Sequence, residues 1–172
     1  FFSTGHTFSL MSGEQGCKVA GCEFKVLPKM HGKWSGVHCS ILGSDLTKAD
    51  KAGTTRVWVD QDSWHVKSTE TDSGGGTKIL KCSYIPVKDG QFRVEHDDNG
   101  LNITGHEDVD SDSVFIEFRN SSGHLLTKQE VSVHNQSLVS YVREFEEDGT
   151  LKATSMWVER KVDESGNEEG SN

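Results

Sequence analysis

The sequence predicts an all-β fold, either an antiparallel up-and-down β-barrel or a β-sandwich, and three observations support this. Short segments in which apolar and polar residues alternate follow one another along most of the chain. Polar turn segments that contain glycine, such as Lys88-Asp89-Gly90 and Asp98-Asn99-Gly100, separate them. No convincing amphipathic helix lies between the segments, and the chain holds only 2 prolines, which suits long hydrogen-bonded strands.

The individual elements follow from these patterns. Residues 1–30 are expected to form an arm that ends in a helical turn or a short strand interrupted by Pro28. Residues 31–162 are expected to form the β-domain, with about 8–10 strands, and residues 163–172 a disordered acidic tail. The expected strands cover residues 33–42, 55–60, 64–71, 77–87, 91–95, 101–107, 113–119, 126–134, 138–146 and 151–162.

Composition restricts the partners. A chain of 172 residues is long enough for one domain with a substantial core. The net charge of -9 repels phosphates, which argues against nucleic acid. No apolar run approaches the ~20 residues of a membrane helix, so no membrane span is expected. The expected partner is a small hydrophobic or amphipathic molecule.

The cysteines and the glycosylation sequons favour a secretory route. Cys17 and Cys22 lie in the arm, whereas Cys39 and Cys82 lie in expected strands. In an oxidising compartment, two disulfides that each join an arm cysteine to a barrel cysteine are expected. Sequons for N-linked glycans begin at Asn102, Asn120 and Asn135. The sequence therefore predicts a glycoprotein that is secreted or held in an organelle lumen.

The segment Gly32-Lys33-Trp34, at the start of the first expected barrel strand, resembles the Gly-x-Trp signature of the calycin superfamily. This superfamily includes the lipocalins, the fatty-acid-binding proteins and relatives such as bilin lyases and nitrobindin-like haem proteins. The segment "REFEEDGTLKATSMW" is similar to the closing hairpin of the bilin-lyase-like and nitrobindin-like relatives. The resemblance implies a barrel in which Trp34 packs against Arg160 of the last strand. It also implies a helical lid, for which residues 42–53 are the only candidate.

The expected ligand site lies inside the barrel, where alternate residues of each strand point inward. In "SLVSYVREFEE" the more apolar face carries Val139, Tyr141, Arg143 and Phe145. Fatty-acid-binding proteins hold a carboxylate with an Arg and a Tyr two residues apart, so the resemblance implies that Tyr141 and Arg143 anchor an acid. An internal salt bridge, or a register in which Arg143 faces solvent, remains the alternative. The other expected ligand-binding residues are Trp58, Trp64, Tyr84, Phe92, Phe118 and Phe145.

The function expected from this site is binding of a small, largely apolar ligand such as a fatty acid, a retinoid-like acid or a tetrapyrrole. Two alternatives stay open: a lyase or isomerase that acts on such a ligand in the same barrel, and a β-sandwich interaction module. Motifs of common enzyme classes are missing from the sequence. The 8 histidines are scattered without metal-ligand spacing, so no metal site is predicted. No cofactor is required, although the resemblance allows a bound tetrapyrrole.

Overall fold

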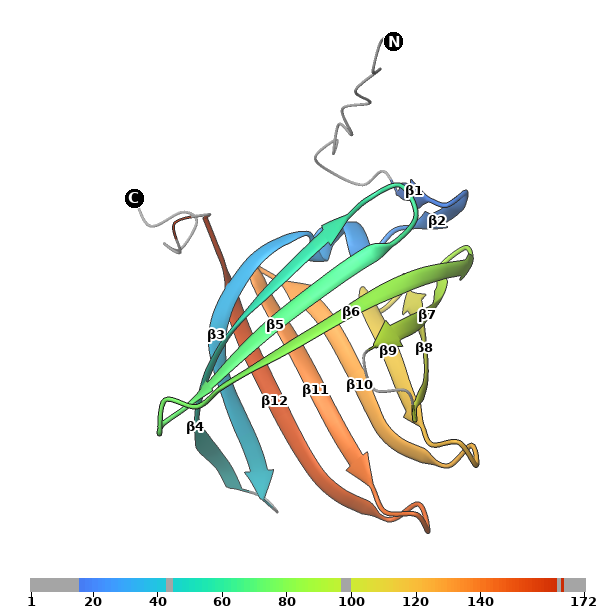
Figure 1. Cartoon of the computed structure of the whole chain (residues 1–172). Coiled ribbons are helices and arrows are strands. Elements are labelled where there is room, and N and C mark those ends of the chain that lie inside the picture. The colour runs from blue at the N-terminus through green and yellow to red at the C-terminus, as the bar shows by residue number, and fades with distance from the viewer. Residues whose placement is uncertain (1–15, 43–44, 97–99, 164, 166–172) are drawn as a thin grey trace.

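The computed structural model describes residues 16–42, 45–96, 100–163 and 165, without the side chains of residues 40–50. Ten antiparallel strands, β3 to β12, form a closed barrel in which each strand pairs with the next and β12 pairs with β3. Figure 1 shows this succession around the barrel. The predicted all-β antiparallel barrel is therefore confirmed. The closed sheet also excludes the β-sandwich on which the interaction-module alternative rested.

The strands lie close to the ranges expected from the sequence, apart from β4. Their bounds are β3 Gly32–Leu42, β4 Asp45–Val59, β5 Trp64–Asp72, β6 Thr77–Lys88, β7 Gln91–His96, β8 Asn102–Asp108, β9 Ser113–Arg119, β10 Leu125–His134, β11 Ser137–Phe145 and β12 Leu151–Val162. The helical lid expected at residues 42–53 is wrong, because residues 45–53 belong to β4 and pair with β3.

One glycine shows how tightly the barrel closes. Gly36 of β3 lies against β12, where its partner across the ladder is Glu159. A Cβ atom at Gly36 would stand 1.9 Å from the carbonyl oxygen of Val158. This distance is much shorter than a van der Waals contact, so no side chain fits there. A residue without a Cβ is needed for so close a backbone approach.

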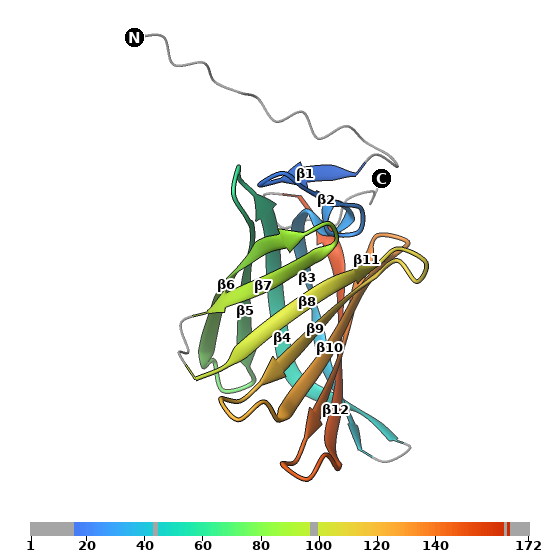
Figure 2. The ribbon, with the colours of Figure 1, turned by 90° about the vertical axis from the view of Figure 1, so that its right-hand side faces the viewer.

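The arm covers one end of the barrel. Strands β1 (Cys17–Val19) and β2 (Cys22–Phe24) form a hairpin, and the 3-10 helix η1 (Leu27–Met30) follows with Pro28 in its first turn, a position that tolerates proline. Figures 1 and 2 show the hairpin and η1 across the same end of the barrel. The arm thus ends in the expected helical turn. We call this end, covered by β1, β2 and η1, the closed end.

The closed end holds most of the hydrophobic core. The arm contributes Val19, Phe24, Val26, Leu27 and Met30, and the barrel contributes Trp34, Val57, Trp64, Phe92, Ile103, Val114, Ile116, Val131 and Leu138. Burial of so many large side chains against one another supplies the main driving force for folding. Phe92, Ile103, Val114 and Ile116 are each at most 3% exposed.

Hydrogen bonds, and not disulfides, tether the arm. The Glu107 carboxylate of β8 accepts hydrogen bonds from the backbone N–H groups of Lys25, Val26 and Leu27 at 2.7, 2.8 and 2.6 Å. The Glu23 N–H donates to Asp89 at 2.8 Å. The bonds to Glu107 satisfy the donors of residues 25–27, which have no strand partner.

The disulfides expected between arm and barrel are absent, because Cys17, Cys22, Cys39 and Cys82 are all free thiols. Cys17 and Cys22 lie in β1 and β2 and pack against the core, while Cys82 lies within β6. The cysteines therefore lend no support to an oxidising compartment.

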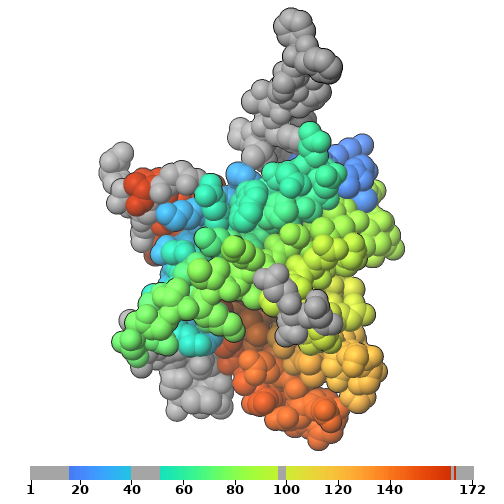
Figure 3. Space-filling model, viewed as in Figure 1, coloured from blue at the N-terminus to red at the C-terminus, as the bar shows by residue number. Residues whose placement is uncertain are grey.

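Strands β3, β5, β7, β9 and β11 run from the closed end and end at the opposite end of the barrel. In the space-filling view, the orange hairpins of β9 to β12 extend beyond the green strands β5 to β7 at this end (Figure 3). We call this end the open end, because neither β1, β2 nor η1 covers it.

Candidate functional site

The barrel encloses a cavity of about 510 Å³, within the range of small-molecule sites. It extends from Leu27 and Met30 of η1 to Glu144 and Ala153, near the β11–β12 turn at the open end. Its walls come from η1 and from strands β3 to β6 and β9 to β12. On β6, β9, β10 and β11 only alternate residues contribute, as expected when every second side chain of a strand points inward. On β4, β5 and β12, some consecutive residues border the cavity as well.

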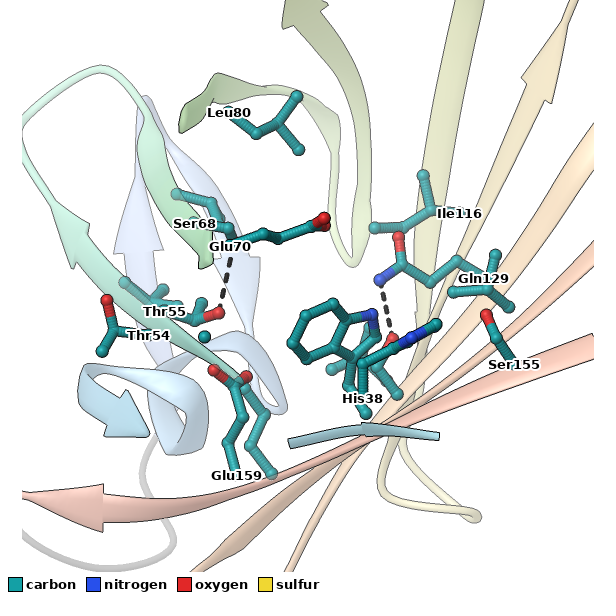
Figure 4. Close-up of a pocket in the computed structure, with 18 of the residues that line it drawn as sticks. His38, Thr54, Thr55, Ser68, Glu70, Leu80, Ile116, Gln129, Ser155 and Glu159 are labelled. Carbon is teal, nitrogen blue, oxygen red and sulfur yellow. Dashed lines mark hydrogen bonds between the residues drawn. The ribbon is translucent and has the colours of Figure 1, made fainter. Parts of the chain in front are cut away.

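The two sides of the cavity differ in character. Strands β6, β9 and β10 contribute an apolar wall that includes Leu80, Val114, Ile116 and Val131. Strands β4, β5, β11 and β12 contribute small hydroxyl side chains, namely Thr55, Ser68, Ser140 and Ser155. In Figure 4, Ile116 lies across the cavity from Thr55 and Ser68. Such a cavity suits a molecule with an apolar body and a polar group.

The polar residues are partly paired with each other. The hydroxyls of Thr55 and Ser68 are 3.2 Å apart, and the Gln129 amide donates to the Ser140 hydroxyl at 2.7 Å. Both bonds are drawn in Figure 4. These pairs fix the orientation of side chains on neighbouring strands.

Glu159 is the most deeply buried charged residue in the cavity wall, with 4% of its surface exposed. Its side chain projects from β12 towards Thr55 (Figure 4). Burial raises the pKa of Glu159 to about 7, and a hydrogen bond from Thr55 acts in the opposite direction. The carboxyl is therefore about half ionised at neutral pH.

His38 of β3 and Trp157 of β12 form an aromatic pair in the cavity wall. Their ring centroids are 4.7 Å apart. Burial lowers the pKa of His38, nearby Lys51 lowers it further, and Glu70 partly offsets this. The imidazole Nδ1 is buried without a hydrogen-bond partner, which is unusual for a polar atom. A bound molecule could supply that partner.

The other charged cavity residues lie towards the open end. Lys51 and Glu70 form an ion pair with 3.7 Å between Nζ and Oε2. Lys78 and Glu144 are exposed on β6 and β11. These charges are solvated or paired, so they stabilise a ligand less than a buried group would.

Tyr141 and Arg143 do not point into the barrel. Both are exposed, and β11 instead lines the cavity with Leu138, Ser140, Val142 and Glu144. The expected inner face of this strand was wrong, so the acid anchor built from Tyr141 and Arg143 has no place in the cavity. The reason lies in the outer surface, where Tyr141 pairs with Met156 of β12 and makes the outer face the more apolar one.

The partner of Trp34 is also different from the one expected. Trp34 is buried at the closed end and its indole N–H donates to the Met30 carbonyl at 2.8 Å. Lys161, its neighbour across the β3–β12 ladder, places Nζ 5.9 Å from the Trp34 ring centroid. Arg160 pairs with Ser35 and is exposed. The expected position of the cation in β12 was therefore off by one residue, which moves the side chain to the other face.

The aromatic residues expected in the ligand site divide into three groups. Tyr84 lines the cavity and stacks on Phe92, with 4.6 Å between the ring centroids. Burial raises the pKa of Tyr84 well above its usual value. Trp64 and Phe92 are fully buried in the core, with Phe118 packed against it.

The remaining two aromatic residues lie away from the cavity. Trp58 is 37% exposed and stacks on His65 with 5.2 Å between the ring centroids. Phe145 is half-buried beyond a bulge in β11 and is not among the cavity-lining residues. Trp58 therefore does not line the expected site, because Val57 takes the inward position on β4.

The three sequon asparagines lie on the barrel surface or in turns. Asn102 is exposed at the start of β8, and Asn135 is exposed in the β10–β11 turn. The Asn120 carboxamide oxygen accepts hydrogen bonds from the backbone N–H groups of Ser122 and His124 in the β9–β10 turn. Glycosylation at these positions stays a prediction.

Three residues of the site were not expected from the sequence: Glu159, His38 as part of an aromatic pair, and Trp157. Alternation alone offers two faces for β12. Trp157, Glu159 and Lys161 share one face, and Met156, Val158 and Arg160 share the other. Ser155, Trp157 and Glu159 line the cavity, and this choice of face could not be read from the alternation of one strand.

Among the described residues, no group of three His, Cys, Asp or Glu side chains could hold a metal ion. Over the same part of the chain, no helix has the length and apolar character needed to cross a membrane. Comparison of the sequence with models of known protein families and with curated proteins finds no match for this chain.

Proposed function

We propose that this protein binds a small, largely apolar molecule inside its barrel. The observation that carries the proposal is the cavity of about 510 Å³, which has an apolar wall on one side and hydroxyl and carboxyl groups on the other. Pockets with this composition are typical of small-molecule sites. The resemblance to calycins points to the same function, as part of the proposal.

The cavity favours some of the expected ligands over others. A tetrapyrrole or a fatty acid would bring carboxylates into a cavity whose most buried charged group is the Glu159 carboxyl. Two carboxyl groups in a low-dielectric site repel one another unless one is protonated. These acids, and a tetrapyrrole above all, therefore fit less well than a ligand without a carboxylate. Secretion or residence in an organelle lumen stays part of the proposal on the three sequons alone.

The proposal is tested with a neutral fluorescent probe, N-phenyl-1-naphthylamine, whose emission rises in an apolar site. We expect saturable binding at one site in the parent protein. Val142→Trp fills the cavity from β11 and should abolish binding. Tyr141→Trp adds a similar ring to the outer face of the same strand and should leave binding unchanged. Circular dichroism confirms that both variants fold. Probe binding that is absent from the parent, or equal in both variants, would overturn the proposal.

A second candidate function is turnover of the ligand in the same cavity. The specific observation in its favour is Glu159, whose pKa of about 7 suits proton transfer at neutral pH. Incubation of a bound ligand with the parent and with Glu159→Gln, followed by mass spectrometry, separates the two functions. A product formed by the parent and lost in the variant indicates catalysis, whereas an unchanged ligand indicates binding alone.

A further inference from the structure

We propose that the ligand carries a protonated amine, and that Glu159 binds it inside the barrel. This inference rests on the proposed function and names the chemical class of the ligand. It reverses the acid-binding expectation, which depended on Arg143. Three features of the cavity support it: the buried carboxyl, the charges around it, and the neighbouring aromatic ring.

The first step is the position of Glu159. Its side chain is 4% exposed and borders the cavity between Thr55 of β4 and Leu138 of β11. A carboxyl in such a place destabilises the protein whenever it is ionised, unless a cation compensates it. A structural role would be served at least as well by glutamine or leucine. A cationic ligand gives the carboxylate its counter-charge and gains a charge-assisted hydrogen bond.

The second step concerns the cations of the cavity wall. Lys51 is paired with Glu70, and Lys78 lies exposed on β6. Lys161 lies at the closed end, where its Nζ is over the Trp34 ring. The influences on the pKa of Glu159 are burial and the Thr55 hydrogen bond, and neither is a positive charge. The cavity therefore holds a deep anionic group whose compensation can come from a ligand.

The third step is the aromatic ring beside this group. Trp157 shares the inner face of β12 with Glu159 and lies against Gly53, where a Cβ atom would stand 2.8 Å from the indole. Glycine at this position leaves room for the ring. An indole face attracts an ammonium ion more strongly than any other side-chain ring does. Opposite, Leu80 and Ile116 offer apolar surface for the body of the ligand.

The test uses three probes of matched size: 4-phenylbutylamine, 4-phenyl-1-butanol and 4-phenylbutanoate. Binding is measured by calorimetry at pH 8 to the parent, to Glu159→Gln and to Glu117→Gln. Glutamine keeps the size of the side chain and removes the charge. Glu117 lies on the strand that carries Ile116, but it pairs with Arg119 at 2.8 Å outside the cavity lining, so its variant controls for net charge.

We expect the parent to bind the amine at least about tenfold more tightly than the alcohol, and the acid most weakly, as for a desolvated ion pair. Glu159→Gln should lose that advantage and bind the alcohol as the parent does. Glu117→Gln should behave like the parent. Equal amine binding by the parent and Glu159→Gln, with alcohol binding intact, overturns the amine inference and leaves the proposed function standing. Failure of all three probes to bind overturns both.

The pH dependence provides a second readout. Because Glu159 must be ionised to hold an ammonium ion, amine affinity for the parent should fall about tenfold from pH 8 to pH 6. Glu159→Gln should show no such fall. The other titratable groups that line the cavity are His38, Lys51, Glu70, Lys78, Tyr84 and Glu144, and His31 and Lys161 lie at the closed end. Since the variant keeps all of them, a fall that persists in Glu159→Gln assigns the effect elsewhere and overturns the inference.

Discussion

The two ends of the barrel use the same strands for different purposes. At the closed end, inward positions carry large apolar side chains such as Trp34, Trp64 and Phe92, and the arm covers them. Towards the open end, Ser68 lines the cavity on β5, the strand that also carries Trp64, and β11 and β12 contribute Ser140, Glu144 and Ser155. The first set fills its space and the second leaves a cavity, because small and charged side chains do not fill the interior of a ten-stranded barrel.

This difference separates stability from binding. Packed apolar contacts stabilise the folded state, and the loss of even one buried methylene group lowers the free energy of unfolding. A cavity contributes no such contacts, so its presence is explained by a ligand that fills it. Substitutions at the closed end should therefore lower the free energy of unfolding, whereas substitutions in the cavity should change binding with smaller effects on stability.

The largest effect is expected from Trp34→Ala. Trp34 is 1% exposed and its indole N–H is bonded to Met30, so the change creates a large void and leaves a carbonyl unpaired. The free energy of unfolding should fall by about 4 kcal/mol, measured by urea denaturation. Trp58→Ala on the outer face is the control, and it should lower the free energy of unfolding by about 1 kcal/mol. Equal losses in both variants would contradict the assignment of the closed end as the stability centre.

The second effect concerns the tether of the arm. Glu107→Ala leaves the N–H groups of Lys25, Val26 and Leu27 without their acceptor. Hydrogen bonds to a charged group are the stronger kind, so we expect a loss of about 3 kcal/mol. Hydrogen exchange should show faster exchange at these three amides. Glu95→Ala removes an exposed carboxylate paired with Arg93 and should leave these amides protected. If the arm stays protected in Glu107→Ala, other contacts hold it.

The closed end was the part that the sequence could predict. There, the inward face of a strand is its apolar face, so alternation of apolar and polar residues identifies Phe92 and Ile103 as interior, and both are buried. Turn segments with glycine correctly marked most strand boundaries. Both signals are local, and both depend on a core that is packed with apolar side chains.

The same signal failed around the cavity. On β11 and β12 the outer faces are the more apolar, because Val139 pairs with Val158 and Tyr141 with Met156 across the outer surface. Choosing the apolar face of β11 as the inner one placed Arg143 inside, whereas Arg143 is exposed. A cavity wall that must stay polar reverses the rule, since alternation identifies two faces but not which of them encloses the ligand.

A third, smaller effect tests the buried carboxyl without a ligand. The folded state raises the pKa of Glu159 from 4.5 to about 7, so the folded protein binds this proton more tightly than the unfolded chain does. This contribution to stability is present below pH 4.5 and is lost as pH rises to about 7. The parent loses this contribution between pH 5 and pH 8, and Glu159→Gln does not. The free energy of unfolding of Glu159→Gln, measured relative to that of the parent, should therefore rise by about 2 kcal/mol between the two pH values.

Urea denaturation of both proteins at the two pH values provides the measurement. The histidines His31 and His38, whose pKa values are lowered mainly by burial, titrate in the same window and oppose the effect. Because both proteins contain them, they cancel in the difference. A difference that does not change with pH would show that Glu159 is solvated in solution.

The smallest effect is expected from Arg143→Ala. Arg143 is exposed on the outer face of β11, where its ladder neighbours are Lys128 and Thr154. The change removes one of two like charges on adjacent strands, so stability should stay within about 0.5 kcal/mol of the parent. Binding of N-phenyl-1-naphthylamine and of 4-phenylbutanoate should also be unchanged. The informative contrast is with Val142→Trp, one residue away on the inner face. A tenfold loss of acid binding in Arg143→Ala would mean that β11 is turned the other way in solution. Ser140 and Val142 would then leave the cavity wall, and the distinction between a packed closed end and a polar cavity would fail on this strand.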